Sequence, residues 1–357
     1  MKNKDINTIQ QKKVSLKPYI YKKPSISAVT IRIMILLSLQ VIMLVITKSY
    51  SALWVVLASA LGTSIANFIH YLFTKKQSFS YLTAIIQGLM IGMLLPETYP
   101  PLYVLLISMI TILIYKYIFE DSENFWVNIV SVAVLFAFFI GKNYFPDFVI
   151  TRDLFNSKNA SSLLIQNGSF PIYDFDVSIT EYLNSNILSH VKVTLPEGYI
   201  SLLWDAKSII PAFRFNLLTI IASIVLFSDN SFSSLIPGLF LLVYAGLVRI
   251  FFPFMNGGEL YQGDILLAIL TSGTLYIAVF MIQWFGTHPL SLVGKIIYAV
   301  LAGVFAFFIV GCGTSPIGMV YVIIICNIVN LLIRQIEEIK VENKITKIAN
   351  TKIVKDR

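Results

Sequence analysis

Long apolar runs, separated by short polar stretches, fill most of this chain. Ten of these runs are long enough, or nearly so, to be membrane helices, because about 20 apolar residues in an α-helix span a bilayer. Some runs are short or interrupted by Gly and Pro, and such spans can be broken helices that line a binding site. The predicted spans are residues 28–47, 52–73, 81–95, 102–118, 125–144, 213–228, 234–252, 261–282, 292–311 and 316–333.

One polar segment, residues 146–212, separates five predicted spans from five others. Both halves show a Gly-rich apolar run, a proline break, a long apolar run and a second break. Because each half holds an odd number of spans, the halves would cross the membrane in opposite directions, as inverted repeats do. We therefore predict an all-α membrane protein of about ten transmembrane helices, with two inverted five-helix repeats at residues 28–145 and 213–333.

The distribution of charge predicts the orientation of these spans. The net charge is +8, and basic residues gather in the tails 1–27 and 334–357, whereas acidic residues outnumber basic ones in 146–212. Loops rich in Lys and Arg stay in the cytoplasm, and an even number of spans leaves both ends on one side. We expect two cytoplasmic tails at a bacterial inner membrane, with residues 146–212 forming an external loop.

Composition and motifs exclude several classes of function. Charged residues make up 13% of the chain, against about 25% in soluble domains, so a water-facing surface would have too few of them. We find no Walker glycine loop, hydrolase elbow or kinase pattern, so the chain is not expected to spend ATP or hydrolyse a substrate by itself. Nucleic acid is not an expected partner, because the positive charge is confined to two tails.

Polar residues in or beside the apolar runs are candidates for an ion pathway. Glu259 and Asp264 stand at the outer start of a span; acids there can form a cation route, and they can also simply favour a helix N-terminus. Asn128 and Asn327 are amides near or inside spans, where they either join helices or line a polar route. Arg214 follows the external loop and could hold a phosphate or extend to the interface.

Several short segments resemble the RnfD/NqrB family. The resemblance covers roughly residues 18–335 and is poorest in the external loop. It rests on a span that ends in Leu-Pro, on an Asn-bearing region whose family prolines are lost, and on a Gly-rich turn before the last span. The segments are Ser25–Met34, Thr83–Pro96, Asn124–Val130 and Gly311–Gly318 followed by Asn327.

The resemblance implies a urea-transporter-like fold and a membrane subunit that couples electron transfer to the movement of sodium or protons. It also implies FMN joined to an external threonine through a phosphoester bond. Thr180, preceded by Ser178 and Asp176, stands near that threonine's place, and Arg214 lies where the flavin would dock. The family's Gly-Ala pair is missing and Ser178 is one residue too close to Thr180, so the backbone shape that a flavin transferase reads is altered.

Three functions remain open at this point. The first is an Rnf/Nqr-like redox subunit, a flavoprotein that works with other membrane and peripheral subunits as a translocase and is not an enzyme alone. The second is a solute channel or secondary transporter with the same inverted-repeat fold, which the altered flavin motif favours. The third is a subunit without a cofactor that only assembles its partners.

Overall fold

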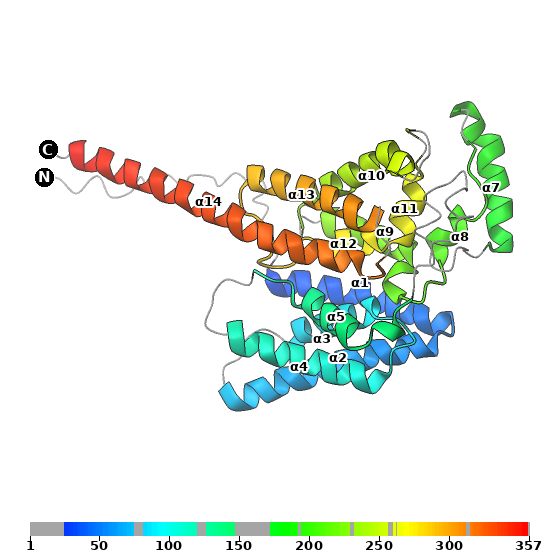
Figure 1. The fold of residues 1–357 in the computed structure, drawn as a ribbon, viewed down its shortest axis with the longest axis horizontal. Coiled ribbons are helices and arrows are strands. Elements are labelled where there is room, and N and C mark those ends of the chain that lie inside the picture. The colour runs from blue at the N-terminus through cyan, green and yellow to red at the C-terminus, as the bar shows by residue number, and fades with distance from the viewer. Residues whose placement is uncertain are drawn as a thin grey trace, which may run out of the picture.

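The computed structural model of the chain consists of helices joined by turns and loops (Figure 1). No strand occurs in the part of the chain that the structure describes, which confirms the predicted all-α class there. That part comprises residues 25–74, 81–119, 126–146, 172–191, 194–228, 232–255, 260–261, 263–311 and 315–355.

Five apolar helices form the first half of the chain, and each overlaps a predicted span. Apolar side chains dominate them, so hydrocarbon or other helices must cover their surfaces. α5 is shorter than the predicted span 125–144 and is followed by a single 3₁₀ turn, η1 (Lys142–Tyr144). The helices are α1 (Ile26–Ile46), α2 (Tyr50–Thr74), α3 (Tyr81–Leu94), α4 (Pro101–Phe119) and α5 (Ile129–Ile140).

The second half forms six helices from its five predicted spans, because one span is divided in two. α13 ends in a π-helical turn, η6 (Phe307–Gly311). The helices are α9 (Asn216–Ser228), α10 (Leu235–Met255), α11 (Ile265–Thr271), α12 (Thr274–Phe280), α13 (Leu292–Ala306) and α14 (Gly318–Lys355).

The predicted helix over 261–282 is interrupted at Gly273. This glycine has a φ of +70°, and a Cβ atom there would collide with the ring of Phe213, so a side chain is disfavoured on both counts. The amide of Asn216 donates to the Leu270 carbonyl at 2.8 Å. It thereby satisfies a carbonyl at a helix end, where intrahelical partners run out. The span is thus a broken helix, as short or Gly-interrupted spans can be.

α14 continues as one helix beyond the predicted end of the last span at residue 333. Its 38 residues measure about 57 Å at 1.5 Å per residue, nearly twice the hydrocarbon thickness of a bilayer, about 30 Å. Buried side chains recur along it as far as Asn330, and most side chains from Gln335 to Thr346 are exposed. The last turns accordingly project from the helical body (Figure 1).

Residues 172–214, which precede α9, are called the α7–α8 segment. The segment lies at the end of the molecule opposite to the projecting end of α14 (Figure 1). Most of it is helical, although the sequence marked it only as a polar loop. Its elements are α7 (Asp174–Asn186), η4 (Leu188–Val191), α8 (Tyr199–Trp204) and η5 (Pro211–Phe213).

Length and composition identify the helices that can cross a membrane. Among the residues that the structure describes, five helices are long and apolar enough: α1, α2, α10, α13 continued by η6, and α14. Four more, α3, α4, α5 and α9, are apolar but shorter. A multi-pass membrane protein is therefore confirmed, whereas ten crossings and an inverted repeat stay predictions.

Four packing contacts of the first half recur in the second when α1–α5 are matched in order with α9, α10, the pair α11 and α12, α13, and α14. In the first half, α2 packs on α3 and α4, α1 packs on α3, and α4 packs on α5. In the second half, α10 packs on α11, α12 and α13, α9 packs on α12, and α13 packs on α14. Across the halves, α1 meets α9 and α5 meets α14, and the Gln40 amide donates to the Thr219 hydroxyl at 3.0 Å.

Small residues let α2 and α3 approach closely. A Cβ atom on Gly88 would lie 2.5 Å from the Cα of Ala60, and one on Gly92 would lie 2.5 Å from the Cα of Val56. The Ser59 hydroxyl donates across the same contact to the Gly88 carbonyl at 2.6 Å. Close packing of small residues with side-chain hydrogen bonds is how membrane helices associate, since lipid gives them little hydrophobic drive.

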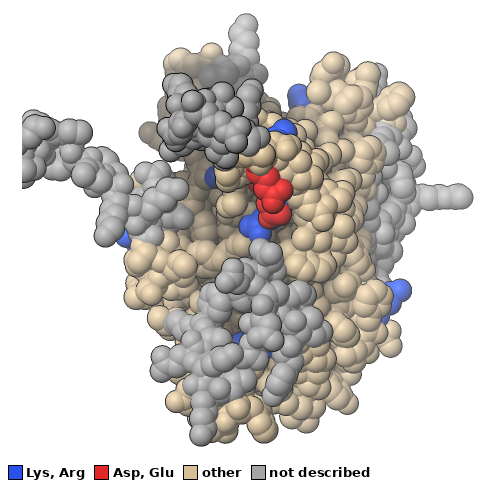
Figure 2. All heavy atoms as spheres, turned by 90° about the vertical axis from the view of Figure 1, so that its left-hand side faces the viewer, with Lys and Arg blue, Asp and Glu red and all other residues tan. Residues whose placement is uncertain are grey.

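Apolar side chains also cover the outside of the helical body. Trp54, Phe139 and Leu242 are each more than 60% exposed, and many other large apolar side chains on these helices are exposed as well. Figure 2 shows the end from which α14 projects, where acidic side chains form one central group, basic side chains are scattered, and most of the described surface is uncharged. The apolar side chains exposed along the helices suit lipid and not water.

Candidate functional site

The polar groups of interest lie in two regions, the α7–α8 segment and the contact between the two halves. In the α7–α8 segment, Asp176 of α7 caps the start of α8. Its carboxylate accepts the backbone N–H of Gly198 at 3.0 Å and that of Ser201 at 2.5 Å. Gly198 has a φ of 101° and no side chain to act as a cap, so Asp176 supplies the missing acceptor from another helix.

Hydrogen bonds control the charge of Asp176. Burial by itself would raise the pKa of this carboxyl, but hydrogen bonds from Gly198, Ser201 and Thr180 outweigh burial and lower its pKa. The Thr180 hydroxyl, one helical turn further on, donates to Asp176 Oδ1 at 2.9 Å. Asp176 and Thr180 are therefore brought together as a buried pair that joins α7 to α8.

A flavin phosphoester at Thr180 does not fit this arrangement. Thr180 is 2% exposed, and a phosphoester would replace the hydroxyl hydrogen that Asp176 accepts. The negative phosphate would then stand beside the carboxylate, and like charges at this distance repel strongly. Ser178, the other residue of the predicted motif, lies on the exposed side of α7 and so does not join the pair.

Arg214, predicted to hold the flavin phosphate, forms a buried ion pair with Asp205. Its Nε donates to one carboxylate oxygen at 2.9 Å and its Nη2 to the other at 2.7 Å. The two side chains are 7% and 4% exposed. Two parallel hydrogen bonds between a guanidinium and a carboxylate are the strongest geometry that this pair can adopt.

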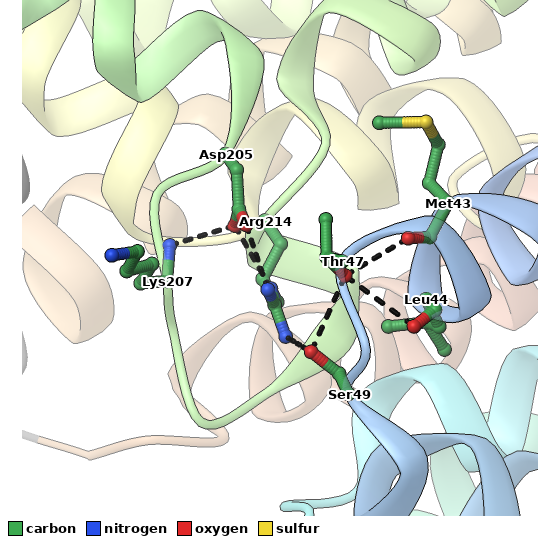
Figure 3. Close-up of polar contacts among 7 residues, drawn as sticks. All are labelled: Met43, Leu44, Thr47, Ser49, Asp205, Lys207 and Arg214. Carbon is green, nitrogen blue, oxygen red and sulfur yellow. Dashed lines mark hydrogen bonds and ion pairs between the residues drawn. The ribbon is translucent and has the colours of Figure 1, made fainter. Parts of the chain in front are cut away.

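The same guanidinium reaches the turn between α1 and α2. Nη1 of Arg214 donates to the Ser49 hydroxyl at 2.6 Å, and the Thr47 hydroxyl lies 3.3 Å from that of Ser49 (Figure 3). Asp205 also accepts the backbone N–H of Lys207 at 2.8 Å. Arg214 thus ties the α7–α8 segment to the first half of the molecule, and each of its three guanidinium nitrogens donates one hydrogen bond to a protein group.

Asp264, one of the two acids of the predicted ion pathway, is the N-cap of α11. Its carboxylate accepts the backbone N–H of Leu267 at 2.9 Å, and it also accepts the hydroxyl of Tyr199 from α8. These contacts match the simpler of its two interpretations, an acid at a helix N-terminus. Glu259, the other acid, lies outside the described residues.

The two predicted asparagines lie where the halves meet. Asn128 is the N-cap of α5 and accepts the backbone N–H of Val130 at 3.0 Å. Its amide donates to the Met281 carbonyl, just after α12, at 3.4 Å. Asn327 is 0% exposed on α14, and both of its side-chain polar atoms lack a partner among the described residues. Because Asp264 begins α11 and Asn128 contacts the end of α12, these two residues mark opposite ends of the broken helix.

Non-helical backbone follows α12 and stays largely buried through Pro289. Side chains from three other parts of the chain donate hydrogen bonds to its carbonyls. Asn128 donates to the carbonyl of Met281, Tyr298 to that of Ile282 at 3.3 Å, and Arg334 to that of His288 at 3.3 Å. Buried backbone outside a helix persists only when its polar groups find such partners. The stretch from Met281 to Pro289 therefore belongs to the candidate site. The sequence did not mark this stretch as part of a site, although Gly286 and Pro289 interrupt the apolar sequence between two predicted spans.

Comparison with known proteins gives the class of the molecule. The NQR2, RnfD, RnfE family matches residues 13–342. The chain belongs to this family. Membership implies a membrane subunit of an Rnf/Nqr-type electron-transport complex with other subunits as its partners. No curated protein matches the chain.

Proposed function

We propose that this chain is a membrane subunit that couples electron transfer within an Rnf/Nqr-type complex to the movement of a cation across the bacterial inner membrane. The family match over nearly the whole chain carries this proposal. Further support comes from the packing contacts that recur in the two halves, since transporters built from repeats hold their ion site where the repeats meet.

The proposed topology has ten crossings in two inverted repeats. α11 and α12 together serve as one crossing, and the shorter α3, α4, α5 and α9 supply four more. The α7–α8 segment lies outside and the end of α14 inside, which agrees with their positions at opposite ends of the molecule (Figure 1). In this topology the ion would pass between the two halves. The hydrogen bonds of Arg214 to Asp205 and Ser49 would hold the halves together on the outer side.

Redox-driven ion uptake tests this function. Inverted vesicles from cells that carry the whole complex are expected to take up a cation when the electron donor is supplied, and vesicles lacking this chain are not. Donor oxidation by the peripheral subunits with an artificial acceptor serves as the control and should persist. Equal uptake in the presence and absence of this chain would contradict the proposal.

A second function, a solute channel or secondary transporter, is favoured by one observation. The hydroxyl of Thr180 is buried and hydrogen-bonded, an arrangement that disfavours covalent FMN at this threonine. We expect no flavin fluorescence from this chain in a denaturing gel, even when a flavin transferase is co-expressed. Solute flux through liposomes that contain this chain alone would favour the channel over the redox subunit.

A further inference from the structure

Two asparagines and a serine form a set of buried polar groups that the described part of the fold leaves without hydrogen bonds. Both side-chain polar atoms of Asn327 and of Asn330, and the hydroxyl of Ser131, are buried and have no partner. All three side chains are 0% exposed. A buried polar group without a partner costs about 1–3 kcal/mol, so several of them in one region indicate a ligand that these groups bind.

The three residues come from packed helices of opposite halves. Ser131 is on α5 and the asparagines are on α14, and these helices contact each other. Asn327 and Asn330 are three residues apart, which places them on one side of α14. Ser131 is likewise three residues after Asn128, whose amide contacts the Met281 carbonyl.

The end of α12 connects the two helices. The hydroxyl of Tyr298, on α13, donates to the carbonyl of Ile282, next to Met281. α5 and α13 therefore both reach the backbone that follows α12, and both helices pack on α14.

The chemistry of the unpaired groups selects the kind of ligand. No acidic residue occurs in α5, in α12 or in the part of α14 before Arg334. Because divalent cations usually require carboxylates, these elements do not favour a divalent cation. Amide and hydroxyl oxygens are neutral ligands, which suit alkali cations. The two amide NH₂ groups need acceptors as well, and water molecules that the cation keeps can accept those hydrogen bonds.

We propose that Asn327, Asn330 and Ser131 form a binding site for a partly hydrated monovalent cation between the halves. The inference rests on the proposed function and names the place where the moving ion is held. Arg334, one turn after Asn330, donates from Nη2 to the His288 carbonyl at 3.3 Å. Its Nε is buried without a partner among the described residues, and its charge disfavours a cation beside it. The cation therefore lies nearer Asn327, which is seven residues and about 10 Å from Arg334 along the helix.

Ligand-dependent stability of the purified full-length chain tests the site. Sodium chloride is expected to raise the Tm of the wild-type protein relative to choline chloride at equal ionic strength, because a ligand of the folded state stabilises it. The paired change Asn327→Leu and Asn330→Leu is expected to abolish this shift while leaving the protein folded, since apolar groups replace unpaired polar ones. The matched control Val322→Leu, on the same helix and 0% exposed, should keep the shift.

Thiol accessibility gives an independent readout of water at the site. With Cys312 and Cys326 changed to Ser, the variant Asn327→Cys is expected to react with a small hydrophilic thiol reagent. Val322→Cys should stay unreactive. Equal reactivity of the two cysteines, or a sodium shift of Tm that survives in the double Leu variant, would overturn the site.

Neither readout uses electron transfer. If sodium does not raise the Tm and Asn327→Cys does not react with the thiol reagent, the cation site is wrong, whereas the family and the proposed function still stand. Conversely, a sodium-dependent shift in a complex that shows no redox-driven uptake would overturn the proposed function and keep the site.

Discussion

Two buried carboxylates hold the α7–α8 segment in place by different means. Asp176 accepts backbone N–H groups and so fixes the start of α8, whereas Asp205 pairs with the Arg214 guanidinium and so reaches the first half through Ser49. The first contact is local to the segment and the second joins distant parts of the chain. Their loss should therefore have different consequences.

Asp176→Asn is expected to loosen the α7–α8 contact. An Asn side chain carries no charge and turns either an oxygen or an NH₂ group toward the backbone donors, and hydrogen bonds to charged groups contribute about 1.5–3 kcal/mol each. We expect faster hydrogen exchange at the amides of Gly198 and Ser201. Asp174→Asn, at an exposed position of the same helix, should leave their exchange unchanged.

The protonation of Asp176 predicts a pH dependence of the same contact. Its pKa in the folded protein is lowered from the ordinary 3.8, so the folded state binds the proton less readily than the unfolded one. The stabilisation is present above pH 3.8 and is lost as the pH falls through the folded-state pKa. Protection of the Gly198 and Ser201 amides should decrease over that acid range in the wild type and stay flat in Asp176→Asn.

Removing one partner of the Arg214–Asp205 pair is expected to destabilise the protein strongly. A single buried charge left without its partner costs about 3–5 kcal/mol. Asp205→Asn should therefore lower the Tm in detergent markedly, and Arg214→Lys should do so too, because an ammonium cannot make the two-pronged contact. The double change Asp205→Leu with Arg214→Met should cost less than either single change. A double variant whose loss equals the sum of two single losses would contradict the pairing.

At the level of elements, the contact between α2 and α3 depends on the absence of side chains. Gly88→Ala would place a Cβ 2.5 Å from the Cα of Ala60, and overpacking of this kind costs about 1–3 kcal/mol. Gly246 on α10 has no atom within 4 Å of its Cβ position. Gly246→Ala should therefore be neutral or stabilising by about 0.5–1 kcal/mol. Thermal unfolding of both variants checks the difference, and equal effects would show that packing at Gly88 is not tight.

Hydropathy predicted where the membrane helices lie, because apolar length is a property of the local sequence. It did not predict the break at Gly273, since that depends on the ring of Phe213, which approaches from 60 residues away along the chain. It also marked the α7–α8 segment as a loop, because short helices with mixed polarity lack a long apolar run. Helix boundaries at these places follow from tertiary contacts that no local pattern contains.

The candidate site was predictable in its residue types and not in its pairings. Arg214 stood out as a lone cation, but its partner Asp205 was only one acid among several in the segment. Asp176 and Thr180 matched a motif in order, whereas their contact with α8 depends on the fold. Asn327 was recognised as an amide in an apolar span, and only the structure shows that it lacks a partner.

At the scale of the whole molecule, the account requires the α7–α8 segment and the end of α14 to lie on opposite sides of the membrane. The two are at opposite ends of the helical body (Figure 1). Ser178 is exposed on α7, and Lys344 is exposed on the projecting part of α14. Single cysteines at these positions can therefore report the side of each end without disturbing a buried contact.

The most direct measurement is labelling of these cysteines in intact spheroplasts with a membrane-impermeant maleimide, after Cys312 and Cys326 have been changed to Ser. The account predicts that Ser178→Cys is labelled in intact spheroplasts and that Lys344→Cys is labelled only after the membrane is opened. Labelling of both cysteines from the same side, or of Lys344→Cys alone from outside, would contradict the topology and the ion route built on it.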